Sequence, residues 1–589
     1  MRAVIVTSST GRFNDIMSMN GLSTANLVLW KPDFTAVVNA LSDQPDSLGE
    51  GVDLKVLRDA TKDIHDTLGS WHYDELGEDL SLVNGCSLGA VFASSSELLF
   101  YNVAQCFLEF KNFIEHYDQI FIDSSGDPVK EFVARWMEKN NYGSFKIVNP
   151  NLNLNECNSD ELFVHPMTLL RDLKHHFLGS FKDSLVGFLL KFVQQKHKKN
   201  ILILDAGKFE GYLTFRDDDR PRSFSILTPI RRNWKVAVGH SVFWQRTGTN
   251  RIYKEVTLAL EKIKEKGWGG GTRVIPTGLF QEATQRFTLT HWCPAFSYFR
   301  YYNALFGSFK SKLVVLASDK SEIPLIVAFA AKKNAIPVAV MPHGIEPFLQ
   351  SKDLDTPDRL FTNYLSIGTY DLQKFIDSGL PREYILDIQL PWFTQKKFLG
   401  KSSNNNVRDR PRAMLLPLDT GFSLELSAGS VVRHLYDMIK VCDLCDIDVF
   451  GIKFRSEREA HAFGLCVGEN NIFGIVIEVY AGYGTLSDYF KDVDLIIGPF
   501  NSGTAECALA HIDYYSFHDF GMYSENPNIF YNSVNCICYV ASTAEELQEN
   551  IAKKRTFKDG HDASSLVSTG ESFAEACLDL DRIFEQCMT

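Results

Sequence analysis

The sequence contains no long uninterrupted run of apolar residues. No stretch approaches the ~18 apolar residues that a membrane-spanning helix needs. The apolar run within residues 1–13 is too short for the core of a signal peptide and predicts a first buried strand instead. We therefore expect a cytoplasmic protein. The apolar stretch 175–199 ends in cationic residues, and it predicts either a core helix or a contact with an anionic membrane surface.

Positive charge is also scarce. The chain has 60 Lys and Arg residues against 73 Asp and Glu residues, a formal net charge of −13. Because contacts to nucleic-acid phosphates require clustered Lys and Arg, this balance argues against a general nucleic-acid binder. It leaves open only a local basic groove.

The 12 cysteines form no disulfide framework. They are scattered, and most lie in apolar segments, as expected for reduced core residues in a cytosol. Cys442 and Cys445 have C-x-x-C spacing, but they lie inside a helical pattern without a second pair of ligands. Because structural zinc takes four ligands, helix packing is the favoured interpretation over metal or redox use.

What the sequence does contain is a regular alternation of short apolar runs and helix-length segments. At 589 residues, with 45% hydrophobic and 23% charged residues, the chain predicts at least two globular domains. Apolar strands separated by helices predict parallel sheets covered on both faces, which is the α/β class. The expected strands are Ala3–Thr7, Gln119–Asp123, Phe145–Val148, Asn200–Asp205, Lys235–Val238, Thr272–Ile275, Lys312–Ala317, Ile336–Met341, Ala413–Pro417, Asp448–Ile452, Ile475–Glu478 and Asp494–Gly498.

Polar stretches suggest where the domains divide. We expect an N-terminal α/β region over residues 1–345, as one lobe or as two lobes split near 150–200. Residues 346–410 would connect it to a C-terminal domain over 411–570. Apolar residues at helical spacing in 571–589 predict a last helix that packs back across the domains.

The turn Met341–Pro347 presents one histidine directly after an apolar strand. His343 could act as a base near neutral pH or donate a hydrogen bond to a phosphate oxygen, with Glu346 close by. The alternative is a turn histidine that caps backbone groups. Asp123 also follows an apolar strand and could orient or deprotonate an acceptor hydroxyl.

A second turn, made of small residues, lies about 150 residues after the first. It follows the strand Asp494–Gly498 and opens a helix, so it predicts a phosphate site at a helix N-terminus. The alternative is that its hydroxyl side chains are only helix caps. The residues of this turn are Asn501, Ser502, Gly503, Thr504 and Glu506.

Two further strand ends could face the same ligand. Lys453 and Arg455 follow the strand Asp448–Ile452, where two cations suit a diphosphate or a carboxylate, although a solvated basic turn is an equal interpretation. Thr420 and Gly421 follow the strand Ala413–Pro417. Since open α/β sheets bind ligands at the carboxyl ends of their strands, we expect two units to face each other across a cleft.

Residues 330–345, 357–393 and 492–510 together resemble glycosyltransferases of the GT-B fold, in which two Rossmann-like domains face each other. The similarity is to bacterial capsule transferases of the Kdo and sialic-acid type and, more distantly, to CDP-glycerol glycerophosphotransferases. It rests on AAKKNAIPVAVMPHGI, on the segment from PDRLF to LPWF, and on DVDLIIGPFNSGTAECALA.

The resemblance implies that His343 lies at the catalytic cleft, that Ser502 and Thr504 lie near donor phosphate, and that Glu506 lies near donor sugar or ribose. Many relatives carry Lys followed closely by His-Pro after the middle C-terminal strand. This chain keeps Lys453 and lacks the His-Pro. A CMP-linked and a UDP-linked donor therefore both stay open.

The favoured function is transfer of a sugar from a nucleotide-activated donor to a saccharide or lipid-linked glycan in surface-polysaccharide synthesis. We expect no cofactor and no metal, because no aspartate cluster of the D-x-D type stands at a strand end, except the surface-like Asp217–Asp219. Alternatives on the same layout are a sugar-nucleotide epimerase and a glycerophosphotransferase. An alternative from another class is a non-catalytic carbohydrate-binding or assembly protein.

Overall fold

The computed structural model describes only part of the 589-residue chain, and every structural statement below concerns that part. The described residues are 2–7, 10–29, 54–123, 128–148, 199–204, 212, 224–227, 249–266, 273–309, 311–317, 322–341, 360–377, 379–391, 409–417, 428–455, 457, 459–461, 463–464, 477–481, 486–517, 538–558, 562–568 and 572–588.

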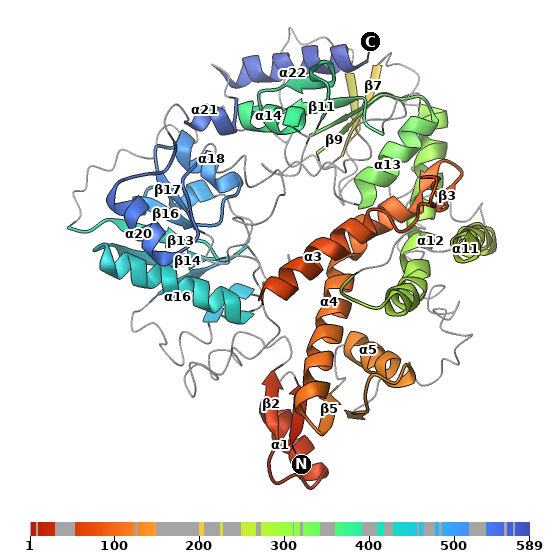
Figure 1. The fold of residues 1–589 in the computed structure, drawn as a ribbon. Helices are drawn as coiled ribbons and strands as arrows, with labels where there is room; N and C mark the ends of the chain where they lie inside the picture. Colours follow the sequence, from red (N-terminus) through yellow and green to blue (C-terminus); the bar gives the residue numbers. More distant parts are fainter. Residues whose placement is uncertain are drawn as a thin grey trace, which may run out of the picture.

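Three all-parallel sheets form the framework of the described chain, with one short antiparallel hairpin besides (Figure 1). The first sheet has the order β2-β1-β5-β6, the middle sheet β12-β11-β10-β9-β7-β8, and the third sheet β15-β14-β13-β16-β17-β18. This confirms the predicted α/β class with parallel, Rossmann-like sheets. The residues predicted as a connecting segment, 346–410, supply β11 and β12 to the middle sheet.

The first sheet is built from β1 (Ala3–Thr7), β2 (Asn26–Leu29), β5 (Gln119–Asp123) and β6 (Phe145–Val148). All five residues of β1 are buried, as expected for a β-branched strand covered on both faces. Pro128 occupies the first position of α5, where a missing N–H costs no hydrogen bond. The helices of this region are α1 (Thr10–Met19), α3 (Leu54–Leu68), α4 (Leu88–His116) and α5 (Pro128–Lys139), and its hairpin is β3 (Leu82–Val83) with β4 (Cys86–Ser87).

The middle sheet draws its strands from a longer stretch of chain. Its strands are β7 (Lys199–Leu204), β8 (Phe224–Leu227), β9 (Ser311–Leu316), β10 (Val338–Val340), β11 (Asn363–Ser366) and β12 (Ile385–Asp387). Its helices are α11 (Thr249–Lys266), α12 (Thr277–Phe309), α13 (Glu322–Lys333), α14 (Thr369–Asp377) and the 3-10 turn η5 (Arg382–Tyr384). The predicted strand Thr272–Ile275 is wrong, because Arg273–Ile275 form bends that lead into α12.

The third sheet contains β13 (Arg412–Leu415), β14 (Asp448–Lys453), β15 (Glu478–Tyr480), β16 (Leu495–Gly498), β17 (Asp513–Phe517) and β18 (Val540–Ala541). Around it lie α16 (Ala428–Leu444), η6 (Leu486–Tyr489), α18 (Ser502–Leu509) and α20 (Ala544–Ala552). The short helix α21 (Ala563–Leu566) contacts both α14 and α18, and α22 (Phe573–Cys587) lies along the middle sheet (Figure 1). One buried cluster on this sheet joins strand residues to α16 and α20.

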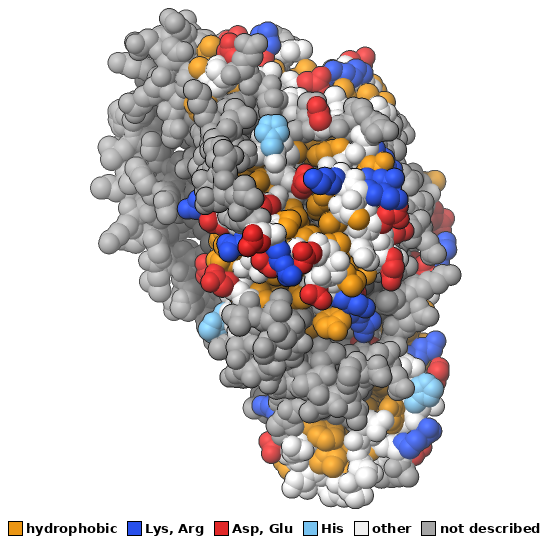
Figure 2. All heavy atoms as spheres, turned by 90° about the vertical axis from the view of Figure 1, so that its left-hand side faces the viewer, with side chains coloured by type: hydrophobic (Ala, Val, Ile, Leu, Met, Phe, Trp, Pro, Cys, Tyr) orange, Lys and Arg blue, Asp and Glu red, His pale blue; other side chains and the backbone are white. Residues whose placement is uncertain are grey.

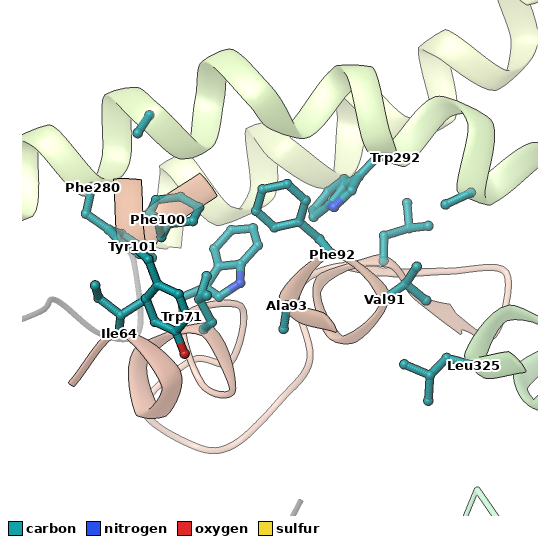
Figure 3. Close-up of a cluster of buried hydrophobic side chains, with 14 of the residues drawn as sticks. Ile64, Trp71, Val91, Phe92, Ala93, Phe100, Tyr101, Phe280, Trp292 and Leu325 are labelled. Atoms are coloured by element: carbon teal, nitrogen blue, oxygen red, sulfur yellow. The ribbon is translucent and has the colours of Figure 1, made fainter. Parts of the chain in front are cut away.

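A single buried core joins the helices of the first region to one face of the middle sheet. Trp71, Phe92, Phe100, Phe280 and Trp292 are all fully buried in it (Figure 3). Phe92 comes from α4 and Trp292 from α12, and these two helices pack against each other. The first two sheets are therefore parts of one continuous body.

A second buried core joins the middle sheet to the third sheet and to α22. The hydroxyl of Tyr212 donates a 2.5 Å hydrogen bond to Asp581 on α22, and its ring meets Phe584 edge-on at 5.6 Å between centroids. The last helix thus packs against a residue 369 positions earlier in the chain. None of the described helices is both long and apolar enough to cross a bilayer.

Candidate functional site

The strand order of the third sheet reverses between β13 and β16. The chain runs from β13 outward through β14 to β15, then returns to β16 on the other side of β13. Such a reversal point, at the carboxyl ends of parallel strands, is where open α/β sheets bind ligands. Here the backbone N–H of Leu416 donates to the Ile497 carbonyl at 2.8 Å, so the two chain segments leave the sheet side by side.

Gly498 permits this close approach. A Cβ atom at that position would lie 2.6 Å from the Leu416 Cβ and 2.8 Å from the Leu416 carbonyl oxygen. Real Cβ atoms do not come so close to backbone atoms, so a larger residue would push β13 and β16 apart. The glycine therefore fixes the geometry of the turn that follows it.

That turn, Asn501 to Glu506, forms a reciprocal cap on α18. The Asn501 side-chain oxygen accepts from the Gly503 N–H at 2.7 Å, and the Asn501 N–H donates to the Thr504 hydroxyl at 3.4 Å. The Asn501 amide nitrogen also donates to the Pro499 carbonyl at 2.9 Å. The side-chain oxygens of Asn501 and Thr504 thus take places that a phosphate oxygen would take at a helix N-terminus.

Two predicted members of this turn are enclosed. Thr504 is 1% exposed and Glu506 is 8% exposed. A Cβ added at Gly503 would meet the Asn501 side-chain oxygen at 2.8 Å and Leu486 of η6 at 3.0 Å. The turn is therefore tightly packed, and a ligand would reach it by replacing the cap rather than by filling an open space.

Lys453 and Arg455 follow the neighbouring strand end on the same edge of the sheet. Lys453 is half-buried and Arg455 is exposed. β14 and β16 lie on either side of β13, which places their ends roughly 10 Å apart at the usual strand spacing. A cation and a helix N-terminus at this separation suit two ends of a diphosphate-bearing ligand.

Two tyrosines, Tyr480 beside Lys453 and Tyr489 beside Tyr480, were not predicted from the sequence. Tyr480 pairs with Lys453 across β14 and β15, and its ring stacks on Phe450 at 5.7 Å and meets Tyr489 at 5.0 Å. Gly451 leaves room for it, because a Cβ there would lie 2.5 Å from the Tyr480 ring. Burial and a hydrogen bond to Glu478 raise the pKa of the Tyr480 hydroxyl, which keeps it neutral.

The carboxyl edge of the middle sheet meets this turn. Tyr370, at the start of α14, contacts the ring of Phe500 at 6.1 Å between centroids, and Phe500 directly precedes Asn501. A second contact lies just after α21, where Ser568 donates its N–H to the Ile367 carbonyl at 2.5 Å. A Cβ at Gly368 would lie 2.6 Å from the Leu566 carbonyl oxygen, so this contact also depends on a glycine.

Four predicted site residues, His343, Glu346, Thr420 and Gly421, lie outside the described residues. Residues 175–198 of the predicted membrane-contact stretch also lie outside them, and Lys199 begins β7. Met341, two residues before His343, is buried in the same cluster as Phe500. Asp123 belongs to the first sheet rather than to the third.

No gathering of three or more His, Cys, Asp or Glu side chains that would suit a metal ion occurs in the described part of the chain. Cys442 is buried on α16, and Cys445 is half-buried in the turn directly after that helix. On the face in Figure 2, acidic and basic side chains are interspersed among apolar ones where residues are described.

No protein-family profile matches this sequence, and no curated protein is significantly similar to it. Some solved structures are similar at a low level. The alignment with a glycosyltransferase from Rickettsia africae ESF-5 covers 67% of this chain and 99% of the glycosyltransferase. The two chains share 11% sequence identity, with a TM-score of 0.33. The UDP-GlcNAc 2-epimerase of Neisseria meningitidis, bound to UDP-GlcNAc, covers 66% and 100%, with 8% identity and a TM-score of 0.38.

The MurG protein of Acinetobacter baumannii covers 66% of this chain and 99% of its own, with 11% identity and a TM-score of 0.32. Similarities of this size decide neither fold nor function. The fold class stated above rests on the parallel pairing of the strands in the three sheets.

Proposed function

We propose that this protein is a glycosyltransferase of the GT-B type that binds a nucleotide-activated sugar at the reversal point of its third sheet. The observation that carries the proposal is one edge of the third sheet, where Lys453 ends β14, Tyr480 ends β15 and the N-terminus of α18 follows β16. A cation, an aromatic ring and a helix N-terminus match the phosphates and the ring of a nucleotide.

In this proposal the cap on α18 is exchanged when the donor binds. The donor phosphate takes the places of the Asn501 and Thr504 side-chain oxygens, and Ser502 and Gly503 line it. Glu506, in the second half of the same turn, orients a donor hydroxyl once the cap has moved. Thr420 and Gly421, which follow β13 in sequence, are proposed to complete the site.

Leaving-group charge would be met by Lys453 and Arg455 together with the helix N-terminus, without a bound metal. His343, Glu346 and Asp123 are the proposed groups for activating the acceptor hydroxyl, with His343 first because its strand, β10, lies in the sheet that meets Phe500. The acceptor is proposed to be a saccharide or lipid-linked glycan on the side of the first two sheets.

The direct test is turnover of nucleotide-sugars by the full chain. Purified protein is incubated separately with UDP-linked and CMP-linked sugars plus glycan acceptors, and free nucleotide and elongated glycan are measured with and without a chelator. Acceptor-dependent nucleotide release that survives chelation supports the proposal. Conversion of UDP-GlcNAc without any acceptor would identify an epimerase instead, and binding of glycan without turnover would identify a non-catalytic protein.

A further inference from the structure

Tyr514 lies directly beside the turn on which the donor site is proposed. It belongs to β17, pairs with Ile496 of β16, and is 3% exposed. Its hydroxyl donates to the Pro499 carbonyl at 2.5 Å and accepts from the Asn501 side-chain amide at 3.3 Å. A buried hydroxyl is costly unless it is hydrogen-bonded, and here its hydrogen bonds go to the turn.

The Tyr514 hydroxyl also stays protonated. Burial raises its pKa well above the usual value, although hydrogen bonds with Thr504 and Asn501 lower that pKa in part. The hydroxyl therefore keeps the proton that it donates to the Pro499 carbonyl. The ring belongs to the same buried cluster as Phe500, so the hydroxyl supports the turn from its apolar side.

The Pro499 carbonyl accepts two hydrogen bonds in this arrangement. One comes from the Tyr514 hydroxyl at 2.5 Å and the other from the Asn501 side-chain nitrogen at 2.9 Å. The oxygen of the same Asn501 amide caps α18 by accepting from Gly503. Because the oxygen and nitrogen of one amide move together, a phosphate that replaces the cap oxygen also draws the nitrogen away from Pro499. The Tyr514 hydroxyl is then the donor that stays.

We infer that Tyr514 is a positioning residue for the donor phosphate, which holds the Pro499 carbonyl in place while the Asn501 cap is exchanged. This inference rests on the donor site proposed above and adds to it a residue of β17. Leaving a buried carbonyl unpaired costs more than one hydrogen bond normally contributes, so the hydroxyl matters most when nucleotide is bound. A tyrosine that served only the packing of the fold would stabilise the free and the bound protein alike.

The test is Tyr514→Phe in the full chain, with Tyr515→Phe as the matched control. Tyr515 is the next residue of β17, is also 3% exposed, and belongs to the buried cluster that joins the sheet to α16 and α20. Both substitutions delete one hydroxyl from a buried ring of the same strand. Urea unfolding measures the stability of each form without ligand. Calorimetric titration measures its affinity for UDP, CDP and GDP and for the matching nucleosides.

We expect Tyr514→Phe to weaken binding of the nucleoside diphosphate by about tenfold, because the bound state is left with an unpaired carbonyl. Without ligand, its unfolding constant should rise less, since Asn501 still donates to Pro499. Affinity for the nucleoside should be unchanged, and Tyr515→Phe should bind every probe as wild type does.

Three results would overturn the inference. The first is equal affinity for the diphosphate in Tyr514→Phe and wild type. The second is an equal loss in both tyrosine variants, or an equal loss for nucleoside and diphosphate in Tyr514→Phe. The third is a Tyr514→Phe protein that does not fold, which would mean that the hydroxyl serves the fold itself.

A second measurement needs no ligand. In an Asn501→Ala background, Tyr514 is the donor that remains on the Pro499 carbonyl. Tyr514→Phe should therefore raise the unfolding constant by about tenfold there, more than it does in wild type. Additive effects of the two substitutions would contradict a shared hold on this carbonyl. If wild type binds none of the three nucleotides, the donor site fails and the role in donor binding falls with it. Non-additive effects would still show that Tyr514 holds the turn.

Discussion

Gly498 lies so close to Leu416 that a Cβ on the glycine would come within 2.6 Å of the leucine Cβ. This contact holds β13 and β16 together at the reversal point from which the candidate donor site is built.

Gly498→Ala should destabilise the protein by about 1–3 kcal/mol, the usual cost of overpacking a tight contact. It should also weaken nucleotide binding, because the strands must separate and move the Asn501 turn. Urea unfolding and nucleotide titration measure the two effects. Gly464→Ala is the control, since among the described residues its Cβ would meet only Val479, at 3.8 Å. Equal stability of the two variants would show that the close contact at Gly498 does not affect the stability of the protein.

Asn501→Ala should remove about 1 kcal/mol of stability, because it deletes the N-cap of α18. If donor phosphate replaces that cap, the variant should gain more stability from bound nucleotide than wild type does. Ser572→Ala deletes the N-cap of α22, away from the site, and serves as the control. Thermal unfolding with and without UDP tests this. Complete loss of UDP binding in Asn501→Ala would mean that Asn501 holds the donor directly.

Lys453→Gln should weaken nucleoside diphosphate binding by about tenfold or more, since it removes a charge-assisted contact to phosphate. Its effect on stability should be small, because Lys453 is only half-buried at a strand end. Lys440→Gln, on the exposed side of α16, provides the comparison. Calorimetric titration with UDP and with uridine separates phosphate contacts from ring contacts. An equal affinity for UDP in both variants would show that Lys453 does not contact the nucleotide.

His343→Ala should reduce acceptor-dependent turnover by about 100-fold if His343 is the general base, while donor affinity stays unchanged. Steady-state kinetics with both substrates distinguish these effects. His461→Ala replaces an exposed histidine of the C-terminal region and should leave turnover intact. Full activity of His343→Ala would show that His343 is not the general base and that another residue activates the acceptor.

Cys442 should resist alkylation in the folded protein. Burial raises the pKa of its thiol to about 12, so almost none is thiolate at pH 8. The pKa of the half-buried Cys445 is also raised by burial, and its greater exposure should make it react faster. Mass spectrometry after iodoacetamide treatment measures both. Rapid modification of Cys442, or a Cys442–Cys445 disulfide, would instead support a redox role for this pair.

The sequence predicted the central strands well, because runs such as Ala3–Thr7 and Asp494–Gly498 are apolar throughout and buried on both faces. It missed β11 and β17, whose residues NYLS and DYYSF mix polar and aromatic side chains. It placed a strand at Ile475–Glu478, whereas β15 runs over Glu478–Tyr480. Apolar pattern alone does not fix where a short edge strand begins.

The candidate site shows a similar limit. The turn at Asn501 was predicted from its small residues and from the strand before it, and the structure places it at the reversal point of the third sheet. That point depends on strand order, which a sequence pattern does not give. For the same reason Tyr480 was missed, since only the pairing of β14 with β15 brings it beside Lys453.

If the donor site is as proposed, the third sheet binds a nucleotide at this edge. The most direct measurement is thermal unfolding of the full chain with CMP, CDP, UDP or GDP, alongside the Lys453→Gln variant. One of these nucleotides, at ~100 times its dissociation constant, should add ~2.7 kcal/mol of stability to wild type, and less to the variant. No shift with any of the four, or the same shift in both proteins, would show that no nucleotide binds at Lys453.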